Sequence, residues 1–485
     1  MRSLLLTEGT YPYVRGGVST WCHLLISGLS EVEFTVFALV GNPSNSLEYA
    51  PSPNLARTIA VPLWGHERMS EYSGADLRSE GRRDPRALRE EFVPLFSAFL
   101  DEIVRGMESA HPQRLVDAIG GIYTYFRKHD YDWTMRREEV WNVTLAEFRS
   151  SAWHDRFMSA LEAIELTRSL YRYLAPLAIE IPASDVVHTS AAGLCGLVAI
   201  AAKSALGFPV VLTEHGVYLR ERVLELARAG FPFSDRSIKK NLFSAIARAT
   251  YAVADIIAPV CSYNATWERF YGVPEERILV IYNGVDETRF DDRNLRPERP
   301  TVTAMVRIDP LKDLETLVAS APFVRERFPN VVFDIWGPIH DEAYNVRVVD
   351  LVRALGLEDC VRFRGSTSDP ASAFAEASVV ALSSISEGFP YSVIEAMMCA
   401  KPVVATDVGG AREAIGECGT VVPPKRPQRL AEALCDLLAR PEEAVLLGKK
   451  ARERALELFT LNGCLANYRA LYGTVALPAS VGAGT

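Results

Sequence analysis

The fold class follows from three features of the sequence. Short apolar runs alternate with helical patterns in both halves of the chain, as expected of parallel sheets joined by right-handed crossover helices. The alternation stops between about residues 64 and 177, where Arg, Glu, Leu and Ala dominate. The chain has 485 residues, more than one hydrophobic core usually supports. We therefore predict an α/β protein with two Rossmann-like, doubly wound domains that face a cleft, and a helical insertion in the amino-terminal domain.

The amino-terminal domain is predicted to cover residues 1–290, including the insertion at about 64–177. Amphipathic patterns predict helices at 18–29, 193–206 and 262–271. Apolar runs predict strands at 3–7, 33–40, 57–61, 185–188, 209–213, 255–259 and 278–281. The charged segment 289–300, which is rich in Arg and contains two prolines, is the expected linker between the domains.

The carboxyl-terminal domain is predicted at residues 300–458. Its expected strands lie at 301–306, 331–336, 361–364, 379–383, 402–405 and 419–422. A helix at 459–473 is long enough to cross back to the first domain, and residues 474–485 are expected to form a frayed tail.

Composition excludes several classes of protein. An apolar content of 48% argues against disorder, and a net charge of −9 argues against a nucleic-acid partner. No signal-peptide core or spanning helix is found, which predicts a cytoplasmic protein. The eight cysteines contain no CxxC pair, so we expect reduced thiols and no metal site. Asp130 and Asp132 form a DxD pair, but no apolar strand precedes them, so we interpret them as a helix boundary.

Charged residues follow the predicted strands of the second domain, where open α/β sheets hold their ligands. Arg307 and Lys312 lie five residues apart around a turn and are suited to gripping one diphosphate. Glu387 lies in a loop and Glu395 in the helix after it, so both carboxylates are expected to face the cleft. The loop joining them contains Gly388, Phe389, Pro390, Tyr391 and Ser392, and its residues other than proline offer backbone N–H groups at a helix start.

The first domain offers weaker signals. Gly16 and Gly17 precede a helix and allow backbone N–H groups to approach a phosphate, although the GxGxxG dinucleotide fingerprint is absent. His188 and His215 are placed at strand ends, where a histidine is more often structural. Because two of the eight histidines fall at the predicted ligand edge, both interpretations stay open. Glu214 and Arg220 are further candidates on the acceptor side.

Together, MVRIDPLKD, the Glu-x7-Glu spacing of Glu387 and Glu395, EAMMCAKPVVATDVGGARE and YNGVD resemble family 4 of the retaining glycosyltransferases, which have the GT-B fold. The similarity covers residues 278 to 460. The opening LLTEGTYPYVRGGVSTW, the insertion and VVLTEHGVYLRER resemble the PelF-type branch, which serves Pel exopolysaccharide synthesis. Many relatives carry a second histidine two residues after the first, where this chain has Ser190.

The resemblance implies roles for these residues. Arg307 and Lys312 would hold the donor diphosphate and stabilise its charge as the sugar–phosphate bond breaks. Glu395 would accept hydrogen bonds from the ribose and Glu387 from the donor sugar, with front-face displacement rather than a glutamate nucleophile. Gly16 and Gly17 would close over the phosphate, and His188 or His215 would line the sugar or acceptor site.

The expected activity is transfer of a sugar, with retention and without a metal or other cofactor, from a nucleoside diphosphate to a growing polysaccharide. UDP is the favoured nucleotide, with glucose, N-acetylglucosamine and N-acetylgalactosamine all open as the sugar. Membrane-embedded synthase partners would place the protein peripherally at the inner face of the membrane. A sugar phosphorylase, a nucleotide-sugar epimerase and a non-catalytic scaffold that binds a nucleotide sugar are the alternatives.

Overall fold

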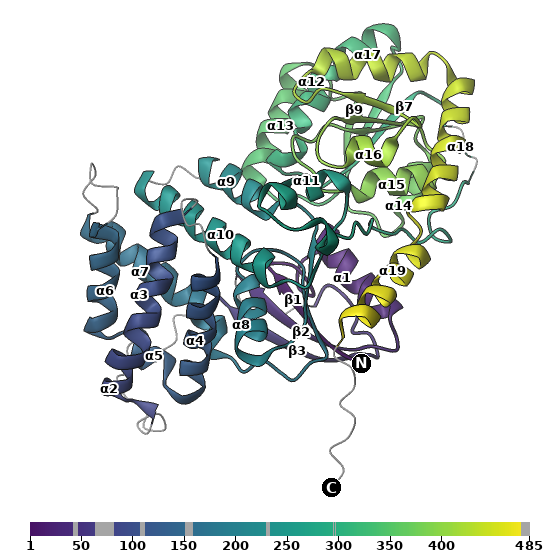
Figure 1. Cartoon of the computed structure of the whole chain (residues 1–485). Coiled ribbons are helices and arrows are strands. Elements are labelled where there is room, and N and C mark those ends of the chain that lie inside the picture. The colour runs from purple at the N-terminus through teal and green to yellow at the C-terminus, as the bar shows by residue number, and fades with distance from the viewer. Residues whose placement is uncertain are drawn as a thin grey trace. The chain divides into compact units, whose positions relative to one another are not determined.

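The computed structural model describes residues 1–41, 47–63, 82–106, 112–150, 159–228, 233–293, 295 and 297–476. These residues form two compact units (Figure 1). Unit 1 comprises Met1–Pro259, Trp267–Leu279 and the described residues from Arg469 onward. Unit 2 comprises Val260–Thr266 and Val280–Tyr468. Each unit contains a parallel sheet with helices packed around it, which confirms the predicted α/β fold class.

The sheet of unit 1 has the strand order β3-β2-β1-β4-β5-β6 within the described residues, and its neighbouring strands are parallel. This is the doubly wound order whose direction reverses between β1 and β4. The central strands are buried on both faces, as their apolar sequences require. The strands are β1 Arg2–Glu8, β2 Glu33–Val40, β3 Leu55–Pro62, β4 Val186–Thr189, β5 Val210–Glu214 and β6 Ile256–Pro259.

One predicted strand of this sheet is wrong. Residues 278–281 were expected to form a strand, but only Ile278 forms a single bridge, with Ile257. The chain passes into unit 2 at Val280, so it cannot continue beside β6. The principal helices around the sheet are α1 Gly17–Gly28, α8 Gly196–Leu206, α9 Tyr218–Arg228, α10 Phe233–Val253, α11 Ser262–Phe270 and α19 Leu461–Val475, of which α11 and α19 extend into unit 2.

The described residues between β3 and β4 are mainly helical. Its core residues, such as Phe96 and Ile119, join the same hydrophobic cluster as Leu4 and Val187 of the sheet. The insertion therefore packs as part of unit 1 rather than as a separate body. Its helices are α2 Pro85–Ala87, α3 Val93–Arg105, α4 Gln113–Lys128, α5 Tyr131–Met135, α6 Glu138–Ser150 and α7 Ala160–Leu174, with a π-helical turn at Leu88–Phe92 and a 3₁₀ turn at Ala175–Ala178.

Unit 2 repeats the doubly wound pattern with the order β12-β11-β10-β7-β8-β9, all parallel. The reversal here lies between β10 and β7. Its strands are β7 Thr301–Met305, β8 Val332–Trp336, β9 Val361–Gly365, β10 Val379–Leu382, β11 Val403–Thr406 and β12 Thr420–Val422. Its helices are α12 Leu314–Arg327, α13 Glu342–Ala354, α14 Pro370–Ala375, α15 Tyr391–Met398, α16 Ala411–Ile415, α17 Pro427–Leu438 and α18 Pro441–Leu458.

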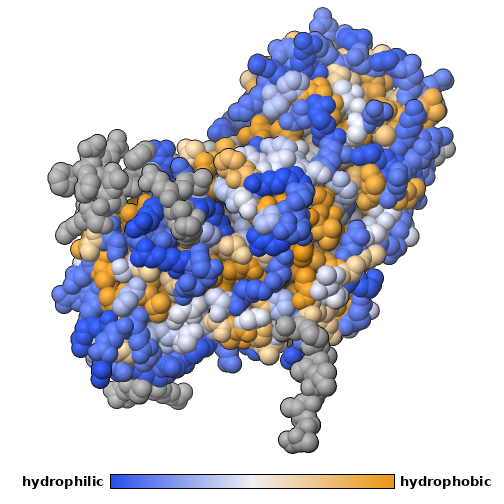
Figure 2. All heavy atoms as spheres, viewed as in Figure 1, coloured by the Kyte–Doolittle hydropathy of each residue, from blue (hydrophilic) through white to orange (hydrophobic). Residues whose placement is uncertain are grey.

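Among the helices described, none is long and apolar enough to cross a lipid bilayer. Figure 2 shows hydrophilic residues spread over both units on the face that it draws.

Candidate active site

Three of the predicted residues come together where the strand order of unit 2 reverses. Arg307 follows β7, Lys312 ends a short 3₁₀ helix, Pro310–Lys312, and Glu387 follows β10. The Lys312 Nζ lies 2.7 Å from Glu387 Oε1, with side chains only 17% and 10% exposed. The hydroxyl of Ser384 donates to the same carboxylate oxygen at 2.5 Å. The ion pair is thus shielded from water, and Glu387 is fixed in orientation.

The loops that carry this pair are tied to each other. The Asp309 carboxylate caps the 3₁₀ helix by accepting from the Leu311 N–H at 2.8 Å, and its other oxygen lies 3.3 Å from Arg307 Nη2. The Ser383 hydroxyl donates to the Lys312 carbonyl at 2.9 Å. The N–H of Ile385 donates to the Leu311 carbonyl, also at 2.9 Å. The two strand ends therefore present their charged groups as one rigid piece.

The loop at Gly388 is held from the next strand. The Gly410 N–H donates to the Gly388 carbonyl at 2.7 Å, and the side-chain amide of Asn283 donates to the Phe389 carbonyl at 3.3 Å. At Gly409, φ is +56°, and an added Cβ would lie 1.9 Å from the Glu387 carbonyl oxygen. Glycine is required there because any side chain would displace the loop that carries Glu387.

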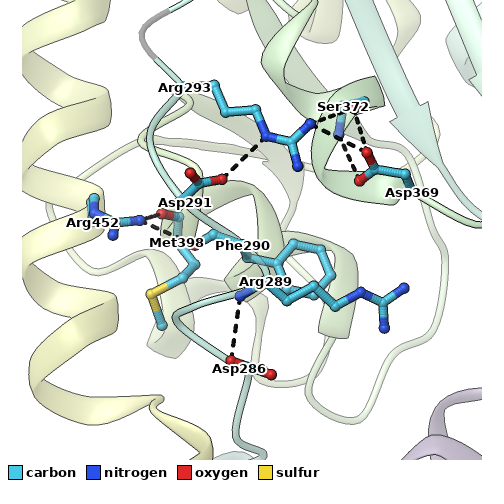
Figure 3. A network of polar contacts seen from close by, with 9 residues as sticks. All are labelled: Asp286, Arg289, Phe290, Asp291, Arg293, Asp369, Ser372, Met398 and Arg452. Carbon is cyan, nitrogen blue, oxygen red and sulfur yellow. Dashed lines mark hydrogen bonds and ion pairs between the residues drawn. The ribbon is translucent and has the colours of Figure 1, made fainter.

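Glu395 lies on α15 and is partly buried. Burial raises the pKa of its carboxyl to about 7, and the nearby positive charge of Arg289 opposes the rise. Arg289 belongs to the segment 286–293 drawn in Figure 3, where Arg452 of α18 hydrogen-bonds to the carbonyls of Phe290 and Met398. Since Met398 ends α15, this contact anchors the segment to the helix that carries Glu395.

The segment in Figure 3 is also joined to α14. Arg293 lies 3.2 Å from Asp291 and 3.2 Å from Asp369, and it hydrogen-bonds to Ser372. Asp369 in turn accepts from the Ser372 hydroxyl at 2.5 Å and caps α14 through the Ser372 N–H, and these two hydrogen bonds lower the pKa of Asp369 to about 2. These contacts restrain the residues on both sides of Arg289.

The predicted histidines lie within unit 1. His188 is completely buried in β4, with Nδ1 2.6 Å from the Tyr472 hydroxyl and Nε2 2.8 Å from Thr213 Oγ1. Both ring nitrogens are therefore engaged inside the unit. His215 follows β5 and packs against Trp21 at 4.6 Å between ring centroids. Burial lowers the pKa of each histidine to about 3, so both are neutral at pH 7.

The weaker candidates of unit 1 are also placed. Glu214 is buried at the end of β5, where the Tyr251 hydroxyl donates to its two oxygens at 2.7 and 2.9 Å. Arg220 is a partly exposed residue of α9. Gly17 begins α1, and Gly16 caps it with φ 172°, an extended backbone that any residue adopts.

The described residues contain no group of three His, Cys, Asp or Glu side chains placed to hold a metal ion. Asp130 caps α5 by accepting from the Trp133 N–H at 2.6 Å, and Asp132 accepts from the Tyr171 hydroxyl at 2.6 Å. The interpretation of this DxD pair as a helix boundary is confirmed.

Sequence reasoning missed Ser384, Gly409 and Gly337. At Gly337, φ is +141° and an added Cβ would lie 1.9 Å from the Val306 carbonyl, directly before Arg307. Gly337 directly follows β8, and Gly409 lies in the GG pair after β11, so glycine at a strand end was the available signal.

Two family models match the chain. Residues 1–276 belong to the family described as "Domain of unknown function (DUF3492)". Residues 285–454, which include Arg307, Lys312, Glu387 and Glu395, match "Glycosyl transferases group 1". The chain belongs to the group 1 glycosyltransferases.

Curated relatives are glycosyltransferases as well. The MMP alpha-(1->4)-mannosyltransferase of Mycolicibacterium hassiacum is 29% identical over 307 residues, or 59% of this chain and 70% of that protein. The D-inositol 3-phosphate glycosyltransferase of Paenarthrobacter aurescens is 30% identical over 284 residues, or 56% of this glycosyltransferase and 68% of that one.

Solved structures share the fold over almost the whole chain. Sucrose-phosphate synthase from Thermosynechococcus elongatus has a TM-score of 0.62 at 21% identity, covering 98% of this chain and 99% of that one. HepE from Anabaena, solved in complex with UDP, has a TM-score of 0.60 at 16% identity, covering 98% and 100%. The predicted GT-B fold is confirmed, and at these identities the likeness extends to the fold alone.

Proposed function

We propose that this glycosyltransferase moves a sugar from a UDP-sugar to a hydroxyl of a growing exopolysaccharide, with retention at the anomeric carbon and without a metal ion. The observation that carries the proposal is the group of Arg307, Lys312 and Glu387 at the point where the strand order of unit 2 reverses. Two cations on a rigid turn suit a diphosphate, and they take the place that a metal ion fills in other transferases.

The roles of the residues follow from their chemistry. Arg307 and Lys312 bind the diphosphate and stabilise the charge that develops on it as the glycosidic bond breaks. When Lys312 turns to the phosphate, Glu387 gains capacity to accept hydrogen bonds from the donor sugar. Glu395 accepts from the ribose hydroxyls, and the loop from Gly388 to Ser392 directs backbone amides to the donor. Gly16 and Gly17 offer backbone N–H groups to the phosphate, and His188 and His215 support the sugar or acceptor site as neutral side chains.

Two comparisons support the choice of donor and acceptor. HepE was solved with UDP and with UDP-glucose, which favours a UDP-sugar. The amino-terminal resemblance to PelF-type enzymes favours an exopolysaccharide acceptor, with synthase partners in the membrane and a cytoplasmic, peripheral protein.

A donor panel tests the proposal. The purified chain is incubated with UDP-glucose, UDP-N-acetylglucosamine, UDP-N-acetylgalactosamine, GDP-mannose and ADP-glucose, with and without EDTA. Nucleotide release and thermal shift are measured, because a ligand that binds the native state stabilises it. We expect one UDP-sugar to be turned over equally with EDTA and the product to keep the α configuration of the donor.

Three results would overturn parts of the proposal. Turnover of GDP- or ADP-sugars alone would reject UDP, and an inverted product would reject retention. An epimerised sugar without nucleotide release would make the protein an epimerase instead.

A further inference from the structure

The unit 1 sheet carries its own group of polar residues where its strand order reverses, between β1 and β4. Glu8 ends β1 and is partly exposed. Its Oε1 accepts from the Tyr218 hydroxyl at 2.7 Å, and its Oε2 accepts from the Cys195 N–H at 3.3 Å. Three loops, those following β1, β4 and β5, therefore meet at one carboxylate, at the position where open α/β sheets bind ligands.

The surroundings hold this carboxylate in place. A Cβ added at Gly193 would lie 2.5 Å from Glu8 Oε2 and 2.3 Å from the Tyr218 ring, so glycine leaves the space that the two side chains occupy. Burial, together with Glu8, raises the pKa of the Tyr218 hydroxyl, which therefore stays protonated and donates. The guanidinium of Arg222 lies 5.3 Å from the centroid of the Tyr218 ring and is paired with Glu225 at 2.8 Å.

The chemistry favours one class of ligand. A carboxylate oxygen can accept about two hydrogen bonds, so each Glu8 oxygen keeps capacity beyond the contact described. Sugar hydroxyls are donors that suit this capacity, whereas a phosphate would meet a like charge. Arg222, whose charge interacts with Glu8, is already paired with Glu225.

We propose that Glu8 binds a hydroxyl of the acceptor, and that the acceptor end held by unit 1 is a neutral saccharide rather than a phosphorylated one. This inference rests on the proposed transferase function, because it names the acceptor class of that reaction. Glu8 acts in binding, and Tyr218 and Gly193 position it.

The test compares donor and acceptor kinetics in Glu8→Gln. The acceptors are neutral gluco-, N-acetylgluco- and N-acetylgalacto-oligosaccharides, with inositol 3-phosphate as the charged counterpart. We expect kcat/KM for the best neutral acceptor to fall about 10-fold or more, as for loss of a charge-assisted hydrogen bond. The KM for the donor and the UDP release without acceptor should stay within about twofold, because the proposal assigns Glu8 to the acceptor and not to the donor.

Matched variants separate binding from structure. Glu165→Gln on α7 removes an exposed carboxylate paired with Arg168 and should leave all parameters unchanged. Tyr218→Phe keeps the ring but loses the donor to Glu8, so it should raise the acceptor KM less than Glu8→Gln does. A fall in Tm with equal losses in donor and acceptor kinetics would show that Glu8 is only structural.

The inference and the proposed function fail in different ways. A wild-type chain that releases no UDP from any UDP-sugar rejects the proposed function. A wild-type chain that releases UDP but uses inositol 3-phosphate, or no neutral saccharide, rejects the inference and the exopolysaccharide acceptor, and leaves the UDP-sugar donor and the transfer reaction of the proposed function standing. An unchanged acceptor kcat/KM in Glu8→Gln also rejects it.

Discussion

The loops after β7 and β10 in unit 2 carry Arg307, Lys312 and Glu387, of which the last two form a shielded ion pair. At the corresponding edge of unit 1, His188 and His215 are neutral, and the partly exposed carboxylate is Glu8. The difference separates two tasks of a transferase. Unit 2 offers the cations that a diphosphate requires, whereas unit 1 offers a hydrogen-bond acceptor that suits uncharged hydroxyls.

Lys312→Ala should have the largest effect, because Lys312 is proposed to stabilise charge that develops only in the transition state. We expect kcat to fall about 100-fold or more, the usual loss for one such group. Steady-state kinetics with the best UDP-sugar measures it. Arg353→Ala, which breaks an exposed ion pair with Asp350 in the same unit, should keep kcat. A Lys312 variant with full kcat would remove the functional contrast between the two units.

The contrast was only partly visible in the sequence. The residues of the unit 2 site fall in two short motifs, and strand-end placement brings the motifs together even though Lys312 and Glu387 lie 75 residues apart. His188 depends on Tyr472, 284 residues away, and Glu8 on Tyr218, 210 residues away. No local pattern encodes such packing, so the sequence left the role of the histidines open and did not single out Glu8.

Glu395→Gln should raise the KM of the donor about 10-fold, because the ionised carboxylate accepts both ribose hydroxyls more strongly than an amide does. Since burial raises the pKa of Glu395 to about 7, the wild-type donor KM should fall as pH rises through that value. The KM measured from pH 6 to 8.5 should vary in the wild type and stay nearly flat in the variant. Equal pH profiles in the two proteins would contradict the assignment.

The unit 1 sheet should lose stability at alkaline pH through Glu214 and Glu268. The two side chains are buried and interact electrostatically, so a proton on one of them relieves the repulsion between two carboxylates. Tyr251 of α10 and Glu221 of α9 also act on Glu214, and the positive charge of Arg269 of α11 opposes the rise in the pKa of Glu268.

Burial raises the pKa of both carboxyls, and a neighbouring carboxylate adds to the rise in each case: Glu221 for Glu214, and Glu214 for Glu268. A raised pKa contributes stability that is complete below the unfolded value and is lost as pH rises through the folded value. The Tm should therefore fall between pH 6 and 9. In the Glu268→Gln variant the side-chain amide can donate a hydrogen bond but does not titrate. The fall in Tm between pH 6 and 9 should therefore be smaller than in the wild type by about 3 °C or more. A wild-type slope retained in this variant would mean that the pair does not cause the fall.

The smallest effect on stability is expected at His188 as the pH falls below neutral. Burial lowers its pKa to about 3, so its contribution to stability is complete above the unfolded value near 6.5 and is lost as pH falls toward 3. Tyr472→Phe removes the hydroxyl 2.6 Å from Nδ1 and should cost about 1 kcal/mol of unfolding free energy at pH 7. Urea unfolding at pH 7 and 5 measures both effects, while kcat stays unchanged if His188 serves packing. A kcat loss well beyond the stability change would instead place His188 in the reaction and make the two units chemically alike.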